Sequence, residues 1–207
     1  MKGNPLIGFV KGAILTLIIF ILIINLTFPV FYNDYVEEFS RSFDVDKYLI
    51  YSIIKAESNF NVKATSEKNA KGLMQILDET GEEVFNTLKI SEGQRDLYNP
   101  KINIMVGTHY IKSLINRYEN DEIKAIAAYN SGMVHADRWS EIDTYNFKDN
   151  IDFKETKNYV DRVESNHRIY KFLYEKLNLG WTSLPDSFSI VSVKFRETIR
   201  TIRRSVG

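Results

Sequence analysis

Residues 47–60 read KYLIYSIIKAESNF, and this stretch predicts an amphipathic helix. Asp46 precedes it, and aspartate is a common residue at the N-cap of a helix. At about 100° per residue the apolar side chains form one arc, while Lys47, Tyr51 and Lys55 fall on the opposite side. The arc consists of Leu49, Ile50, Ile53, Ile54 and Ala56. We therefore expect a capped helix with one buried face.

Glu57 falls inside this apolar arc, between the directions of Ile53 and Ile50. A charged carboxylate among apolar side chains is costly, so it either finds a partner or keeps its proton to a higher pH than a surface glutamate. A carboxyl group with a raised pKa is suited to general acid catalysis near neutral pH. The alternative is structural, because a glutamate in the last turn can reach solvent or pair with a lysine. The periodicity leaves both interpretations open.

Three more helical patterns follow, and strand patterns are sparse. The first starts near Thr80, whose spacing to Glu83 fits a capping box. The second opens at Asn99, directly before a proline, and the third covers residues 122–129 and ends at Gly132. Each of the three predicts a helix of the body.

A long helical pattern over residues 156–177 completes the body. Its apolar face is expected to consist of Tyr159, Val163, Tyr170 and Leu177. No repeat, low-complexity tract or Pro/Gly-rich linker divides residues 40–180. The sequence therefore predicts a single, mainly α domain over residues 34–180.

Two short motifs carry side chains suited to a carbohydrate. In KGLMQI (residues 71–76), Met74 can pack on a sugar ring and the Gln75 amide can hold a polar substituent, while the glycine lets the backbone approach a ligand. In AAYNSG (residues 127–132), Tyr129 and Asn130 place an aromatic ring and an amide at a helix end. A buried turn and a helix cap are the structural alternatives.

The order of the motifs resembles the catalytic domain of soluble-lytic-transglycosylase-type enzymes. The matching segments are ES-x-F (57–60), GLMQI (72–76), NP-x-x-NI-x-x-G (99–107), AYNSG (128–132) and ET-x-x-YV (155–160). The resemblance covers about residues 42–177 and implies a lysozyme-like, mainly helical fold. The chain departs from the family pattern at residues 132–135, GMVH, where a glycine-rich turn is usually followed by proline.

The resemblance also implies roles for single residues. Glu57 is implied to be the sole catalytic acid/base, with the hydroxyl of Tyr159 pointing toward it. The residues implied to line the glycan cleft are Ser58, Met74, Gln75, Tyr129 and Asn130.

The implied reaction is cleavage of peptidoglycan between N-acetylmuramic acid and N-acetylglucosamine. Glu57 protonates the bridging oxygen while the muramic acetamide stabilises positive charge at the anomeric carbon. The resulting carboxylate then takes a proton from the 6-hydroxyl of the same sugar, which closes a 1,6-anhydro ring. Because an intramolecular hydroxyl has a high effective concentration, no second carboxylate is needed to position water. The scheme needs no metal or organic cofactor.

Two other functions fit the same residues. A hydrolytic muramidase would use a second carboxylate, for which Asp78, Glu79 and Glu83 are the candidates. The structural alternative is that these acidic residues lie in the solvated first turn of a helix, where negative charge is favourable. A membrane-tethered glycan-binding protein without turnover is the other alternative.

Residues 13–28, AILTLIIFILIINLTF, form an apolar run that, with flanks at 6–10 and 30–31, can cross a hydrocarbon core of about 30 Å. Lys2 and Lys11 precede the run and acidic residues follow it, which predicts that the body lies on the extracytoplasmic face of the cell membrane. We expect an uncleaved, single-pass signal anchor over residues 1–33. A cleaved signal peptide is the alternative, but NLTFPVFY (25–32) has no small-x-small cleavage site.

The chain of 207 residues carries 27 basic and 27 acidic side chains, so its net charge does not indicate binding to nucleic acid. It has no cysteine, which excludes disulfides and thiolate catalysis, and its three histidines lack the spacing of a metal-binding pair. The C-terminal tail, residues 181–207, is basic and has an amphipathic helical pattern. That pattern predicts contact with anionic lipid or an acidic wall polymer, with a short strand or an unstructured end as the alternatives.

Overall fold

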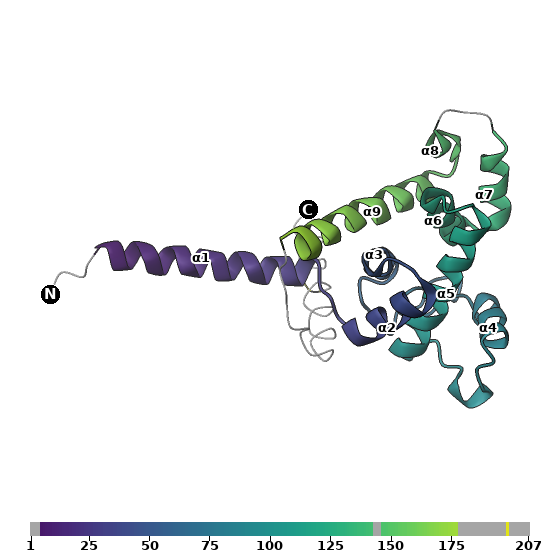
Figure 1. The fold of residues 1–207 in the computed structure, drawn as a ribbon, viewed down its shortest axis with the longest axis horizontal. Helices are drawn as coiled ribbons and strands as arrows, with labels where there is room; N and C mark the ends of the chain where they lie inside the picture. Colours follow the sequence, from purple (N-terminus) through teal and green to yellow (C-terminus); the bar gives the residue numbers. More distant parts are fainter. Residues whose placement is uncertain (1–4, 143–145, 178–197, 199–207) are drawn as a thin grey trace.

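A computed structural model of the chain describes residues 5–142, 146–177 and residue 198, and this part is helical, with two isolated β-bridges as its only β structure. An N-terminal helix, α1 (Pro5–Thr27), projects as a rod from a body that contains the other helices (Figure 1). The body comprises α2 (Asn33–Phe43), α3 (Lys47–Glu57), α4 (Asp78–Thr87), η1 (Glu92–Gln94), α5 (Pro100–Arg117), α6 (Glu122–Ser131), α7 (Met133–Ser140), α8 (Phe147–Asn150), α9 (Lys154–Tyr170) and η2 (Lys171–Lys176). The mainly α fold is confirmed.

Helix α1 is a candidate membrane span by its length and composition. Its segment Phe9–Thr27 has 19 residues and a mean hydropathy of 2.5. Its large side chains face solvent, with Leu15 and Phe20 each 58% exposed, whereas a core helix would bury them. This exposure suits a helix surrounded by lipid.

The body begins directly where α1 ends. The Phe28 ring packs edge-on against Tyr170 at 5.4 Å, and the Tyr170 hydroxyl donates to the carbonyl of Pro29 at 2.9 Å. Phe31 and Tyr32 are 2% and 5% exposed and belong to the body's core. Residue 31, expected as a flank of the apolar span, therefore packs in the body.

Helix α3 runs through the middle of the core. Leu49, Ile50, Ile53 and Ile54 of its apolar arc have no exposed surface. Tyr51, expected on the polar side, is also buried, because its ring stacks on Tyr170 at 5.5 Å. Helices α2 and α9 cover this side, so α3 is buried over more than one face, and the expected exposure of Tyr51 is wrong.

Three of the expected helix boundaries are confirmed. The Asp46 carboxylate accepts a hydrogen bond from the N–H of Tyr48 at 2.8 Å, and Asn99 caps α5 in the same way through Lys101 and Ile102. Helix α6 ends at Gly132, whose φ of 86° few other residues adopt. These caps fix where α3, α5 and α6 begin or end.

The capping box at Thr80 is wrong, because α4 begins two residues earlier, at Asp78. Its N-cap, Leu77, has an extended backbone and no side-chain cap. The bridge between Lys71 and Ile76 leads the chain into the helix, and the first turn carries Asp78 and Glu79, which favour the positive end of the helix dipole.

Helix α9 also differs from its expected form. It begins at Lys154 and continues at its C-terminal end as a π-helical segment, η2. This change of helix type rotates the following residues, so that Leu173 is buried while Leu177 is 50% exposed. Tyr159, Val163 and Tyr170 form the buried face as expected, and the inclusion of Leu177 is wrong.

Candidate active site

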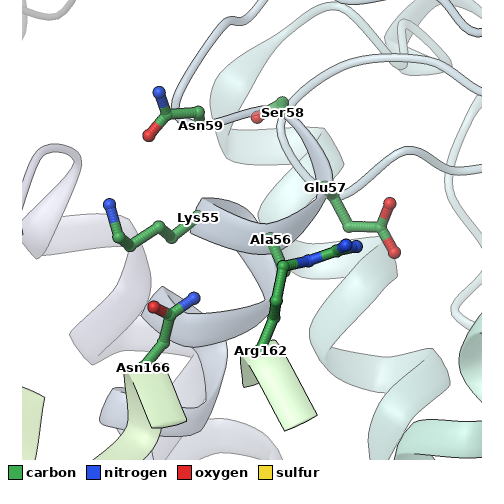
Figure 2. Close-up of a pocket in the computed structure, with 7 residues that line it drawn as sticks. All are labelled: Lys55, Ala56, Glu57, Ser58, Asn59, Arg162 and Asn166. Carbon is green, nitrogen blue, oxygen red and sulfur yellow. The ribbon is translucent and has the colours of Figure 1, made fainter. Parts of the chain in front are cut away.

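Glu57 is the last residue of α3 and lines a cavity of about 560 Å³. Figure 2 shows the cavity between the end of α3 and helix α9. Its lining residues are Lys55, Ala56, Glu57, Ser58, Asn59, Arg162 and Asn166. Glu57 is the one carboxylate among them, so any acid chemistry in this cavity depends on it.

Burial raises the pKa of Glu57 to about 7. An interaction with the Tyr159 hydroxyl and the positive charge of Arg162 both lower the pKa, but burial outweighs them. A group with this pKa is about half protonated at neutral pH and can both give and take a proton there. The raised pKa agrees with the position of Glu57 on the apolar arc.

The turn after α3 fixes the direction of Glu57. Asn59 and Phe60 have positive φ values of 50° and 66°, so the chain reverses within three residues of the glutamate. The Phe60 side chain is buried against Phe31 at 5.8 Å, which anchors the turn in the core. Ser58 lines the cavity and its hydroxyl donates to the carbonyl of Ile54 at 3.3 Å.

Tyr129 lies close enough to Glu57 to be affected by its charge, and it is hydrogen bonded to the Met74 backbone. The Tyr129 hydroxyl donates to the carbonyl of Met74 at 2.8 Å, and the N–H of Met74 donates to the Asn103 side chain at 2.7 Å. The Met74 side chain has no exposed surface, so in this structure it does not face a ligand. Burial and the charge of Glu57 raise the pKa of Tyr129, which keeps its hydroxyl protonated near the glutamate.

Gly72 and Gly107, two glycines of the family motifs, allow other parts of the protein to pack closely against the backbone. A Cβ atom on Gly72 would come within 2.4 Å of both the Asn103 amide nitrogen and the Leu97 carbonyl oxygen. One on Gly107 would lie 2.4 Å from the Met74 sulfur. The close approach expected between Gly72 and a ligand is therefore made to the protein itself.

The Gln75 amide nitrogen donates to the carbonyls of Gly72 and Ala64, at 2.9 and 3.2 Å. Both donors are thus used within the protein, and the side-chain carbonyl oxygen is left for a ligand. Asn130 is partly exposed in the last turn of α6. The structure brings Glu57 and Ser58 to one cavity, whereas Met74, Gln75, Tyr129 and Asn130 lie outside its lining.

Tyr159 is 1% exposed on the face of α9 that meets α3. Its hydroxyl interacts with the Glu57 carboxyl but lies outside ordinary hydrogen-bond geometry, so it is buried without a well-formed bond. Burial and the charge of Glu57 raise the pKa of Tyr159 far enough to keep it neutral.

The proposed second carboxylates lie elsewhere. Asp78 pairs with Lys71 at 2.6 Å, and Glu79 and Glu83 are exposed on α4. None of the three lines the cavity with Glu57. Within the described residues, no group of three His, Cys, Asp or Glu side chains is arranged to hold a metal ion.

Two further residues, Arg162 and Asn166, reach the cavity from α9 and were not predicted from the sequence. Arg162 follows Tyr159 by three residues and Asn166 follows Arg162 by four, so the three fall on neighbouring rows of the helix. The sequence shows this spacing, but it does not show that α9 crosses the end of α3.

Proteins similar to this chain in sequence are lytic transglycosylases. The sequence model of a protein family described as "Transglycosylase SLT domain" matches residues 34–152. The soluble lytic murein transglycosylase of Salmonella typhimurium is 32% identical over 151 residues, which are 70% of this chain and 23% of that protein. Membrane-bound lytic murein transglycosylase E of Buchnera aphidicola is 48% identical over 82 residues, 38% of this chain and 39% of that protein.

Among solved structures, an inactive Glu-to-Gln mutant of the lytic transglycosylase Slt from Pseudomonas aeruginosa superposes with a TM-score of 0.68. It is 27% identical, over 75% of this chain and 26% of that chain. This chain thus spans about a quarter of the length of its soluble relatives. From the matched domain and the shared fold, the chain belongs to the transglycosylase SLT domain family.

Proposed function

We propose that this protein is a membrane-anchored lytic transglycosylase that cleaves the β-1,4 bond between N-acetylmuramic acid and N-acetylglucosamine in peptidoglycan. The observation that carries the proposal is Glu57, a lone carboxyl group in a cavity with a pKa of about 7. The names of its relatives as soluble or membrane-bound lytic murein transglycosylases support the same activity.

In the first step, protonated Glu57 gives its proton to the bridging oxygen, and the bond to the anomeric carbon breaks. The acetamide of the muramic sugar stabilises the positive charge that develops there. In the second step, the Glu57 carboxylate removes the proton of the 6-hydroxyl, whose oxygen attacks the anomeric carbon. A 1,6-anhydro product forms, and Glu57 is again protonated, which one group with a pKa near 7 can achieve.

The other family residues divide into two roles in this proposal. Ser58, Asn130 and the free carbonyl oxygen of Gln75 are available to bind the glycan. Tyr129, Met74 and Tyr159 hold or tune the site, because Tyr129 fastens the Met74 backbone and Tyr159 favours the charged form of Glu57.

Helix α1 is proposed to cross the cell membrane once and to hold the body on the extracytoplasmic face, where peptidoglycan lies. Its exposed apolar surface and the membrane-bound relatives support an anchor. Lys2 before α1 and Lys11 near its N-terminal end favour this orientation. The predicted lipid or polymer contact of residues 181–207 lies outside the described residues, apart from residue 198.

Mass analysis of the sugar ends released from purified cell wall tests the proposal. The full chain in detergent is expected to release 1,6-anhydro ends, and Glu57→Gln is expected to release none, because an amide cannot exchange the proton. Glu79→Gln, an exposed carboxylate on α4, is the matched control and should act as the wild type. Reducing ends would instead indicate a hydrolase, and an active Glu57→Gln variant would reject the mechanism.

A further inference from the structure

Arg162 lines the cavity, but in the proposed acid/base chemistry it contacts neither the substrate nor the transferred proton. Its side chain reaches from α9 to the end of α3 and extends to the same side as the Glu57 carboxyl (Figure 2). It forms no ion pair with Glu57, nor with any other carboxylate of the described residues. Its guanidinium carbon lies 5.7 Å from the centre of the Tyr159 ring, a stacking contact that leaves the N–H groups at its edge available.

Resting on the proposed function, we propose that Arg162 binds a carboxylate on the side arm of the muramic sugar, next to the bond that Glu57 cleaves. A guanidinium presents a planar set of N–H donors that matches a carboxylate in a two-point hydrogen bond. Asn59 and Asn166 line the same cavity, and Ala56 is its one apolar lining residue. Such a lining suits a polar, charged arm better than the flat apolar face of a sugar ring.

The charges around Glu57 favour an anionic ligand. The groups that act on Glu57 are Arg162 and Tyr159 from α9 and Tyr129 from α6. Lys55, on the same helix as Glu57, extends away from the Glu57 carboxyl (Figure 2). Both tyrosines are neutral at neutral pH, and the Lys55 ammonium contacts the Thr27 carbonyl and lies 4.7 Å from the centre of the Phe28 ring. When Glu57 is protonated, as the first step requires, no lining residue carries a negative charge. A substrate carboxylate bound in the cavity would supply a negative charge to pair with Arg162.

Ligand and proton should therefore bind cooperatively. Free Arg162 stabilises the charged form of Glu57 and lowers its pKa. A carboxylate bound to Arg162 offsets that positive charge and raises the affinity of Glu57 for its proton. By linkage, protonation of Glu57 strengthens the binding of the carboxylate to the same extent. The substrate thus helps to load the acid that cleaves it.

Two parts of the substrate can supply the carboxylate. In a strand that carries peptides, it belongs to the stem peptide. In a strand without peptides, it is the lactyl carboxylate of the muramic sugar itself. Both present the same chemistry to Arg162, and the experiment separates them.

The test compares cell wall with free carboxyl groups and wall whose carboxyl groups have been converted to methylamides, each digested by the full chain in detergent. Both walls are also prepared after an amidase has removed the peptides. We expect the wild type to cleave blocked wall about tenfold less efficiently, from the typical strength of a charged hydrogen bond. A preference shown only on peptide-bearing wall identifies the stem peptide, and one shown only on peptide-free wall identifies the lactyl group. A preference on both walls shows that Arg162 accepts either carboxylate.

Arg162→Gln should cleave free and blocked walls at the same rate, close to the rate of the wild type on blocked wall. Arg162→Lys should keep part of the preference. Arg168→Gln is the matched control, because Arg168 is exposed on the same helix outside the cavity, and it should keep the full preference. The alkaline fall of kcat should lie at higher pH on free than on blocked wall, and this difference should vanish in Arg162→Gln.

Equal cleavage of free and blocked walls by the wild type would overturn the inference and leave the proposed function intact. So would an Arg162→Gln variant that keeps the preference. A wild-type protein that cleaves none of the walls would instead reject the proposed function, and this inference with it.

Discussion

At the scale of single residues, the proposed chemistry depends on two opposing effects on the pKa of one carboxyl group. Burial favours neutral Glu57, while Tyr159 and Arg162 favour its charged form. Burial is the larger effect and brings the pKa from 4.5 to about 7. Without the two opposing groups the proton would be held more tightly and released less readily for the second step.

Replacing Tyr159 by Phe removes one of these opposing groups, so the pKa of Glu57 should rise. The acid form then persists to higher pH, and the alkaline fall of kcat/KM should move upward. Because the hydroxyl has no well-formed hydrogen bond, the free energy of unfolding should change by less than about 1 kcal/mol. A pH profile with an unmoved alkaline limb would contradict this role.

Tyr170→Phe is the control, since the Tyr170 hydroxyl is bonded to the carbonyl of Pro29. It should lower stability by about 1 kcal/mol and leave the pH profile unchanged.

The sequence predicted the surroundings of a single residue only where helical periodicity determines them. Periodicity placed Glu57 among apolar neighbours, because all of them lie within one helix. It did not find Arg162, which meets Glu57 through the crossing of α3 and α9. Nor did it show that the Gln75 amide donors bond to the carbonyls of Gly72 and Ala64. Contacts between elements distant in sequence leave no mark on local periodicity.

At the scale of elements, Asp46 joins the start of α3 to α9. Burial opposes its ionisation, but hydrogen bonds from His167, the N–H of Tyr48 and Lys171 outweigh burial and lower the pKa of Asp46 to about 2. The folded-state pKa is below the ordinary value of 3.8, so the stabilisation is complete above about pH 4. It is lost as the pH falls from about 4 to about 2.

Asp46→Ala should therefore lower the free energy of unfolding at pH 7 by about 1–2 kcal/mol, the typical value of an N-cap. Asp46→Asn keeps an oxygen that can accept from Tyr48, so it should lose less stability. In both variants the fall in stability between pH 4 and pH 2 should be smaller than in the wild type. Urea unfolding at several pH values measures both effects, and equal pH dependence in all three proteins would contradict them.

The 71–76 turn is held against α5 by contact between Met74 and Gly107. Gly107→Ala would place a methyl group 2.8 Å from the Met74 Cβ, and should lower the free energy of unfolding by about 1–3 kcal/mol. Gly93→Ala is the control, because nothing lies within 4 Å of that position. Thermal unfolding compares the two, and equal stability would show that Met74 is not tightly packed.

Element boundaries were predictable where a cap has a clear side-chain signal. Asp46, Asn99 and Gly132 gave such signals. The start of α4 did not, because the turn before it delivers the chain in an extended direction to Leu77. Helix α2 was not predicted, although Val36 and Phe39 bury its apolar side, because its eleven residues are mostly polar.

At the scale of the whole molecule, the body is joined to α1 without a linker. Tyr174 donates to the carbonyl of Phe28 at 2.6 Å, and Lys55, two residues before Glu57, contacts the last carbonyl of α1. The end of α9 therefore lies beside the end of α1 (Figure 1). With α1 in a membrane, this attachment would hold the cavity close to the bilayer surface.

Removing the anchor should leave a folded body only if the cut preserves residues 28–32. A fragment of residues 28–207 keeps Phe31 and Tyr32 in the core, whereas 34–207 loses both and should be about 3–5 kcal/mol less stable. Phe31→Ala in the longer fragment should reproduce part of the loss. Fragments 28–207 and 34–207 that unfold at the same temperature would show that this segment does not belong to the body.

The raised pKa of Glu57 is the central claim, and a titration of its carboxyl carbon by nuclear magnetic resonance tests it most directly. Glutamate is labelled with carbon-13 at the carboxyl group in the full chain, and the Glu57 signal is identified by its absence from Glu57→Gln. We predict a midpoint near pH 7 for that signal. A midpoint near pH 4.5, as for a glutamate in water, would contradict the account.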